Sequence, residues 1–112
     1  MKHERSRDER RLRRRFPLSY ELRYRTLENE DREPGQGKTI NISSRGLLFT
    51  IDRVLSPGMK VEIHVDWPFK LDDRVALKLV LFGRVVRVQG KEHLQAAMRI
   101  ERHEFRTVSQ AP

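Results

Sequence analysis

Two short stretches of this 112-residue chain carry the side chains best suited to bind an anion or a nucleotide. The first is "RRLRRRF" at residues 10–16, where Arg11 and Arg15 are four residues apart and Arg10 directly precedes them. The second is "NISSRG" at residues 41–46, which combines short polar side chains with a terminal glycine. Arginine binds phosphate and purine edges through paired hydrogen bonds, and its planar face stacks on bases. The residue types therefore predict a binding site.

Each stretch also has an ordinary interpretation. A basic arm is often a solvated tail, and N-x-S-x-x-G is typical of a turn in which Asn41 and Ser43 cap backbone N–H groups and Gly46 takes a positive φ. The sequence contains no recognisable catalytic motif. Ser43 and Ser44 lie outside a nucleophile elbow, and the four histidines have no neighbours at metal-ligand spacing. We therefore expect no enzyme, no metal site and no cofactor.

The charge of the chain is concentrated at its N-terminus. The formal net charge is +8, and residues 1–15 hold eight basic against three acidic side chains. An arm this rich in arginine predicts an anionic partner. The apolar stretches are too short to span a bilayer, and the N-terminus lacks the apolar segment of a secretory signal. The chain is therefore expected to be cytoplasmic, with no membrane span.

The segments that must position these residues are predicted to be β-strands. Apolar and polar residues alternate in several segments separated by turns rich in glycine, proline and acidic residues. The predicted strands cover residues 18–24, 38–42, 46–51, 60–67, 75–89 and 93–101. We expect Pro68 to end the fourth strand, residues 68–73 to form a loop, and Gly83 to bend the fifth strand.

The expected fold is an all-β, small six-stranded antiparallel barrel. We expect a flexible arginine-rich arm at residues 1–15, the barrel at residues 16–106 and a disordered tail at residues 107–112. The polar sequence after Ile100 is also compatible with a short C-terminal helix.

In combination, the two polar stretches are more specific than either is alone. R-x-x-x-R, then a strand, then [D/N]-x-S-x-x-G some 25 residues later resembles the PilZ domain family of bacterial proteins. The turn and strand "SPGMKVEIHV" and the final strand "LQAAMRIE" extend the resemblance over most of the chain. The resemblance implies binding of the second messenger cyclic di-GMP and signalling to a downstream protein that the sequence does not identify.

The family's binding residues transfer to matching positions of this chain. They are Arg10, Arg11, Arg15, Asn41, Ser43 and Gly46, with Arg14, Arg45 and Arg99 as secondary candidates. The family often has Asp where this chain has Asn41, and a carboxamide accepts hydrogen bonds on one arm only. Because Arg10 adds a guanidinium directly before the motif, we predict a stacked pair of ligand molecules per chain.

Two other functions stay open at this point. A small barrel with a basic arm is also suited to bind nucleic acid, although we expect the body to lack the solvent-facing aromatic pair on which single strands stack. A PilZ-fold interaction protein that has lost its ligand is the other alternative, and such proteins usually lack the arginine motif that this chain retains.

Overall fold

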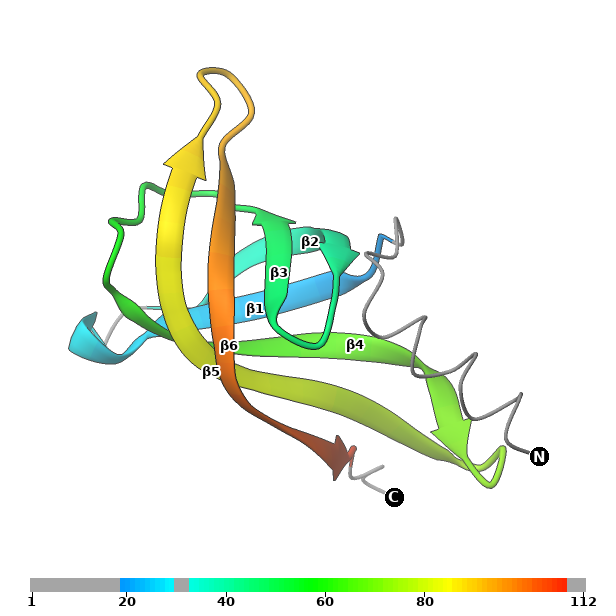
Figure 1. Cartoon of the computed structure of the whole chain (residues 1–112). Coiled ribbons are helices and arrows are strands. Elements are labelled where there is room, and N and C mark those ends of the chain that lie inside the picture. Colours follow the sequence, from blue (N-terminus) through cyan, green and yellow to red (C-terminus); the bar gives the residue numbers. More distant parts are fainter. Residues whose placement is uncertain (1–18, 30–32, 109–112) are drawn as a thin grey trace, which may run out of the picture.

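The computed structural model describes residues 19–29 and 33–108, which form one closed antiparallel barrel (Figure 1). The strand order around the barrel is β1-β2-β3-β6-β5-β4. The elements are β1 (Glu21–Thr26), the 3₁₀ turn η1 (Leu27–Asn29), β2 (Gly35–Ile42), β3 (Gly46–Thr50), β4 (Lys60–Leu71), β5 (Val75–Gln89) and β6 (Gln95–Thr107). The predicted six-stranded barrel is therefore confirmed.

The barrel encloses the apolar residues that the alternation assigned to the interior. Val61, Ile63 and Val65 of β4 are fully buried, as are Ala96 and Met98 of β6. Burial of side chains of this size contributes about 1.5–3 kcal/mol each, which makes the inner face the main source of stability. Polar residues of the same strands lie on the outer face, where a ligand can reach them.

The longest strand, β5, bends at Gly83, where its register against β6 shifts because Glu101 of β6 is an extra residue opposite the Phe82–Gly83 step. A Cβ atom at Gly83 would lie 1.9 Å from the carbonyl oxygen of Arg99, so only glycine permits this approach of β5 to β6. The bend is visible in Figure 1, where β5 pairs with β6 in both its upright and its lower part, and with β4 in the lower part as well. The predicted bend at Gly83 is confirmed.

Two sequence-based expectations about strand ends are wrong. β4 does not end at Pro68 but continues to Leu71. Beyond Val65 it has lost its β1 neighbour and pairs with β5 alone, so a proline there breaks no hydrogen bond to a second strand.

The expectation of a short C-terminal helix is also wrong over the described residues, because β6 runs to Thr107. The N–H of Val108 still donates to the carbonyl of Ala76, so the sheet reaches the last described residue. Polar residues on both faces gave this segment no apolar alternation from which a strand could be read. Within residues 19–29 and 33–108, no helix has the length and apolar character needed to cross a bilayer.

Candidate ligand-binding site

A bulge in β2 decides which of its residues face outward. The register against β3 shifts by one residue between Thr39 and Asn41. Thr39 is buried, and Ile42 packs against the core although it lies three residues further on. Without the extra residue, strict alternation would carry Asn41 to the inner face. The bulge therefore presents the Asn41 side chain on the outer surface.

The turn between β2 and β3 is held by Ser43. Its backbone N–H donates to the carbonyl of Gly46 at 2.9 Å, and its Oγ accepts from the N–H groups of Arg45 and Gly46 at 3.4 and 3.3 Å. Gly46 is not among the glycines with positive φ, so the ordinary interpretation of this glycine as a left-handed turn residue is wrong. A Cβ atom at Gly46 would instead lie 3.0 Å from the carbonyl oxygen of Met98. Gly46 thus allows β3 to lie close to β6.

The outer face beside this turn has a floor of small or apolar residues. Asn41 is opposite Leu48, and Leu48 is opposite Ala97 of β6. Because neighbouring strands are about 4.8 Å apart, Asn41 lies roughly 10 Å from Ala97. Gly46 occupies the next outward position of β3 and has no side chain. The result is a flat, shallow surface bordered by the Asn41 amide.

Arginine side chains border the other side of this floor. Arg99 is directly opposite Gly46, and on the far side of β6 Arg84 and Arg87 of β5 are opposite Arg99 and Ala97. Arg84 forms an ion pair with Glu101 at 3.7 Å, and no such pair of Arg87 or Arg99 occurs within the described part of the chain. The cationic border and flat floor favour an anionic, planar ligand.

The structure therefore brings together five of the predicted residues. Asn41, Ser43, Gly46 and Arg99 meet at the junction of β2, β3 and β6, and Arg45 lies exposed at the tip of the turn, where its carbonyl accepts from Ile100 N–H at 2.8 Å. The arginines of the N-terminal motif, Arg10, Arg11, Arg14 and Arg15, lie outside the described residues.

Sequence reasoning missed Arg84 and Arg87. Both lie at outward positions of β5, and the segment "GRVVRV" alone does not show that a bulge after Val85 brings Arg87 to the outer face. The pairing of the last two predicted strands would have placed Arg84 beside Arg99, so that part of the signal was present in the sequence.

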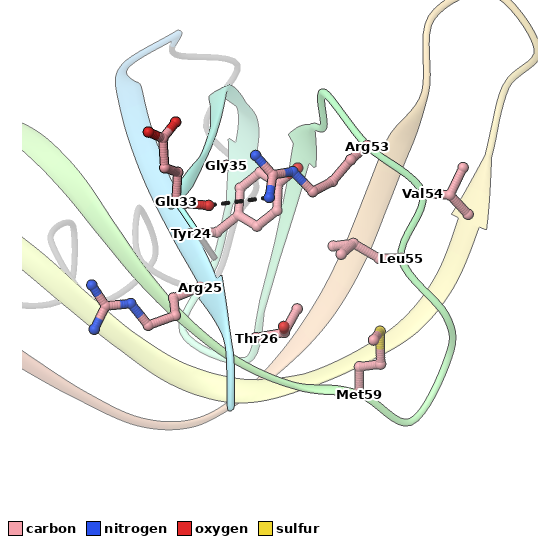
Figure 2. Close-up of a pocket in the computed structure, with 9 residues that line it drawn as sticks. All are labelled: Tyr24, Arg25, Thr26, Glu33, Gly35, Arg53, Val54, Leu55 and Met59. Carbon is pink, nitrogen blue, oxygen red and sulfur yellow. Dashed lines mark hydrogen bonds between the residues drawn. The ribbon is translucent and has the colours of Figure 1, made fainter. Parts of the chain in front are cut away.

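A small cavity of about 40 Å³ lies at another end of the barrel, between β1 and the segment that follows β3 (Figure 2). The Tyr24 hydroxyl donates to Asp52 Oδ1 at 2.5 Å, and the Arg53 guanidinium donates to the carbonyl of Glu33 at 3.1 Å. Burial, followed by the hydrogen bond to Asp52, raises the pKa of Tyr24. The cavity holds little more than a water molecule and cannot accept a nucleotide.

A larger hollow of about 420 Å³ lies on the outer face of β1, β4 and β5. Its lining mixes both signs of charge: Arg23, Arg25 and Lys78 are basic, and Glu62 and Asp66 are acidic. Glu62 also contacts His64 Nε2 at 2.6 Å. A surface with this mixture of charge attracts an anion less than the β2–β3–β6 face, where the bordering side chains are arginines.

One expectation about aromatic residues is wrong. Trp67 packs against the core as predicted, but Phe69 and Phe105 beside it are 65 % and 51 % exposed. The ring centroids of Phe69 and Phe105 lie 6.1 and 5.4 Å from that of Trp67. The body of the protein therefore does present solvent-facing aromatic side chains, on strands that the sequence did not predict to extend so far.

Comparison with known proteins completes the description of the site. Searches of curated proteins and of solved structures returned no significant match. The family model described as "PilZ domain" matches residues 6–110, a range that contains the N-terminal arginines, the β2–β3 turn and all six strands. With a match over nearly the whole chain and a closed six-stranded barrel, this protein belongs to the PilZ domain family.

Proposed function

We propose that this protein is a cyclic di-GMP receptor that binds its ligand on the outer face of β2, β3 and β6. PilZ domains are generally cyclic di-GMP-binding modules and act as receptors rather than enzymes. The observation that carries the proposal is the convergence of Asn41, Ser43, Gly46 and Arg99 at one flat surface.

The chemistry of the ligand fits this surface. Cyclic di-GMP is a dianion with two guanines, so it needs cations for its phosphates and flat contacts for its bases. Arg99 and Arg87 supply guanidinium groups on one side, and the low floor over Gly46 and Ala97 lets a purine ring approach the sheet. Asn41 offers an amide oxygen to the donor edge of a guanine.

The arginine motif supplies the remaining contacts in this proposal. Arg11 and Arg15 bind phosphate or the O6/N7 edge of guanine, and Arg10 stacks on an exposed base. Two stacked ligand molecules carry four negative charges, which the density of arginine in the motif and around the β2–β3 turn neutralises. We propose two ligands per chain, with Arg10→Leu shifting the ratio toward one.

The output of the module is a change of conformation or surface that a partner protein reads. Ordering of the N-terminal arm against the β2–β3–β6 face alters both the shape and the charge of that face.

The decisive experiment is a calorimetric titration with cyclic di-GMP at moderate salt. We expect saturable binding, weakened by about 1.5–3 kcal/mol in Arg11→Ala and in Arg15→Ala, the scale of a hydrogen bond to a charged group. Arg13→Ala is the matched control within the motif and should lose little affinity at high salt.

The same titration tests the described part of the site. Arg99→Ala should weaken binding, whereas Arg74→Ala removes the same charge from the exposed β4–β5 turn and should not. Binding to a polynucleotide but not to cyclic di-GMP would favour the nucleic-acid alternative, for which Phe69 and Phe105 provide stacking surfaces. No binding to either would favour a PilZ-fold interaction protein.

A further inference from the structure

Three strands continue beyond the closed part of the barrel. We define the three-stranded extension as residues 66–71 of β4, 75–82 of β5 and 100–107 of β6. The β1–β4 pairing stops at Val65 and the β3–β6 pairing stops at Arg99, so only β4–β5 and β5–β6 pairs remain in the extension. The outer edges of the extension, on β4 and β6, have no partner strand within the described residues.

The inner face of the extension is apolar and open. Phe69, Leu71 and Phe105 are 65 %, 49 % and 51 % exposed, and Val75 is 36 % exposed. Phe69 and Phe105 contact Trp67, the last residue on this face of β4 to pack against the core. An open sheet edge beside exposed aromatic residues is a template for pairing with another strand.

The backbone groups at the β6 edge can be assigned from one hydrogen bond. The N–H of Val108 donates to the carbonyl of Ala76 at 2.8 Å, so this opposed pair is a hydrogen-bonded one. Hydrogen-bonded pairs alternate along an antiparallel ladder, and residues 106, 104 and 102 therefore bond to β5. The N–H and C=O groups of residues 103, 105 and 107 consequently point to the open edge.

This alternation restricts how β6 can pair with a copy of itself. An antiparallel partner must oppose edge-facing residues to edge-facing residues, so position 105 can face only an odd-numbered position of the other copy, and 103, 105 and 107 give the longest overlap. The registers with 103 or 107 opposite 105 place Glu104 against Glu104 or Arg106 against Arg106. Like charges directly opposite each other destabilise a sheet.

The register that centres on Phe105 contains no like-charge pair. It opposes Phe105 to Phe105, and Glu104 of each copy to Arg106 of the other. These two side chains already pair within one chain, at 2.8 Å, and both remain about 40 % exposed. A register centred on His103 also matches charges, but it opposes Phe105 to Glu101 and leaves the aromatic surface uncovered.

We propose that this protein forms a homodimer by antiparallel pairing of β6 with β6 of a second copy, with Phe105 on the two-fold axis. Residues 102–108 of each copy form a ladder of about six backbone hydrogen bonds. The two Phe105 rings meet on the inner face, and the aromatic clusters around Trp67 join across the axis. A partner with the same sequence is favoured because the charge pattern of the edge is complementary to itself.

Charge-reversal variants distinguish loss of the contact between the two copies from misfolding of the variant. Glu104→Arg places the introduced arginine against Arg106 of the other copy twice, and Arg106→Glu places two glutamates together twice. Each variant alone should raise the dimer dissociation constant about tenfold or more in analytical ultracentrifugation. Mixing the two variants creates only opposite-charge pairs and should restore dimers, as should the double variant.

A cross-link tests the register directly. The chain contains no cysteine, so Phe105→Cys introduces one thiol, and opposed residues in a hydrogen-bonded pair have Cα atoms about 5.5 Å apart, within disulfide range. Mild oxidation should yield a covalent dimer. Val54→Cys is the control, because Val54 is 75 % exposed but follows β3.

Two outcomes would overturn the proposal. One is a mass of 13.4 kDa for the unmodified protein over about a hundredfold range of concentration. The other is failure of the mixed charge variants to form dimers while circular dichroism shows both to be folded. Equal cross-linking of Phe105→Cys and Val54→Cys would exclude this register.

Discussion

Replacement of Tyr24 by phenylalanine isolates the contact that fastens the segment after β3 to β1. The Tyr24 ring is 2 % exposed, and its hydroxyl donates to Asp52 Oδ1 and accepts from Asp52 N–H at 3.2 Å. Asp52 Oδ2 also accepts from the N–H of Gln36 at 3.1 Å. Tyr24→Phe removes the hydroxyl and leaves the ring in place, so the edge-to-face contact with Phe49 is retained.

The size of the effect follows from the partners that remain. A hydrogen bond to a charged group contributes about 1.5–3 kcal/mol. The Asp52 side chain is 44 % exposed and keeps Gln36, Arg53 and solvent as partners, so we expect the lower end, about 1.5 kcal/mol. For a domain of this size, that loss lowers the melting temperature by about 6–12 °C.

The stability that the Tyr24–Asp52 contact contributes depends on pH. Burial and the hydrogen bond to Asp52 raise the pKa of Tyr24 above its ordinary 10.0, so the stability that this contact provides is present below pH 10.0 and declines above it. Burial opposes ionisation of Asp52, but hydrogen bonds from Tyr24 and Gln36 and the charge of Arg53 together lower its pKa below 3.8. Stability from Asp52 is therefore lost as the pH falls through that lowered value.

Urea unfolding followed by circular dichroism between about pH 3 and pH 11 measures both effects. Tyr24→Phe should be least stable relative to the parent near pH 7, and the difference should shrink at both ends of the range. Tyr20→Phe is the control, because no hydrogen bond of the Tyr20 hydroxyl occurs within the described residues. A difference below about 0.5 kcal/mol at every pH would refute the assigned role of the contact.

Three further predictions concern the β5–β6 bend and the ligand-binding face. Gly83→Ala should cost about 2–3 kcal/mol in denaturant unfolding, because its methyl group meets the carbonyl oxygen of Arg99 at 1.9 Å; parent-like stability would show that β5 and β6 can separate there without cost. Ser43→Ala should cost less than about 1 kcal/mol of stability, since the Oγ bonds are 3.3–3.4 Å long, but should weaken cyclic di-GMP binding in calorimetry; unchanged affinity would make Ser43 a turn residue only. Asn41→Asp should bind at least as tightly as the parent if the side chain faces the guanine donor edge, and a clear loss would place it against a phosphate.

The barrel could be predicted from the sequence because its signal is local. Val61, Ile63 and Val65 alternate with polar residues, Ala96 and Met98 lie two residues apart between Gln95 and Arg99, and each set is buried as expected. Short turns between successive segments favour the β1–β2, β2–β3, β4–β5 and β5–β6 pairs, whereas the β1–β4 and β3–β6 pairs that close the barrel join segments far apart in the sequence.

The extension could not be predicted, because its signal is not local. Pro68 reads as a strand terminator unless it is known that β4 has already lost one neighbour. Residues 101–107 have no apolar alternation, and pairing with β5 rather than burial keeps them extended. Because the ends of β4 and β6 were predicted wrongly, the exposure of Phe69 and Phe105 was not predicted either.

The binding face could be predicted in composition but not in geometry. The motif identified Asn41, Ser43 and Gly46, yet the outward position of Asn41 depends on a bulge that no residue type in "KTINI" indicates. Arg87 depends on a second bulge, after Val85. Where register shifts decide which side of a sheet a residue faces, residue types alone do not determine the outcome.

The position of Trp67 makes the protein its own spectroscopic probe. It is the only tryptophan of the chain, and its indole contacts Tyr20, which precedes β1, at 5.9 Å, as well as Phe69 and Phe105 of the extension. Indole emission shifts to the blue as water is excluded, so one wavelength reports on the end of β1 and on the β6 edge together. Emission measured during dilution would therefore report dissociation of the proposed dimer without any label.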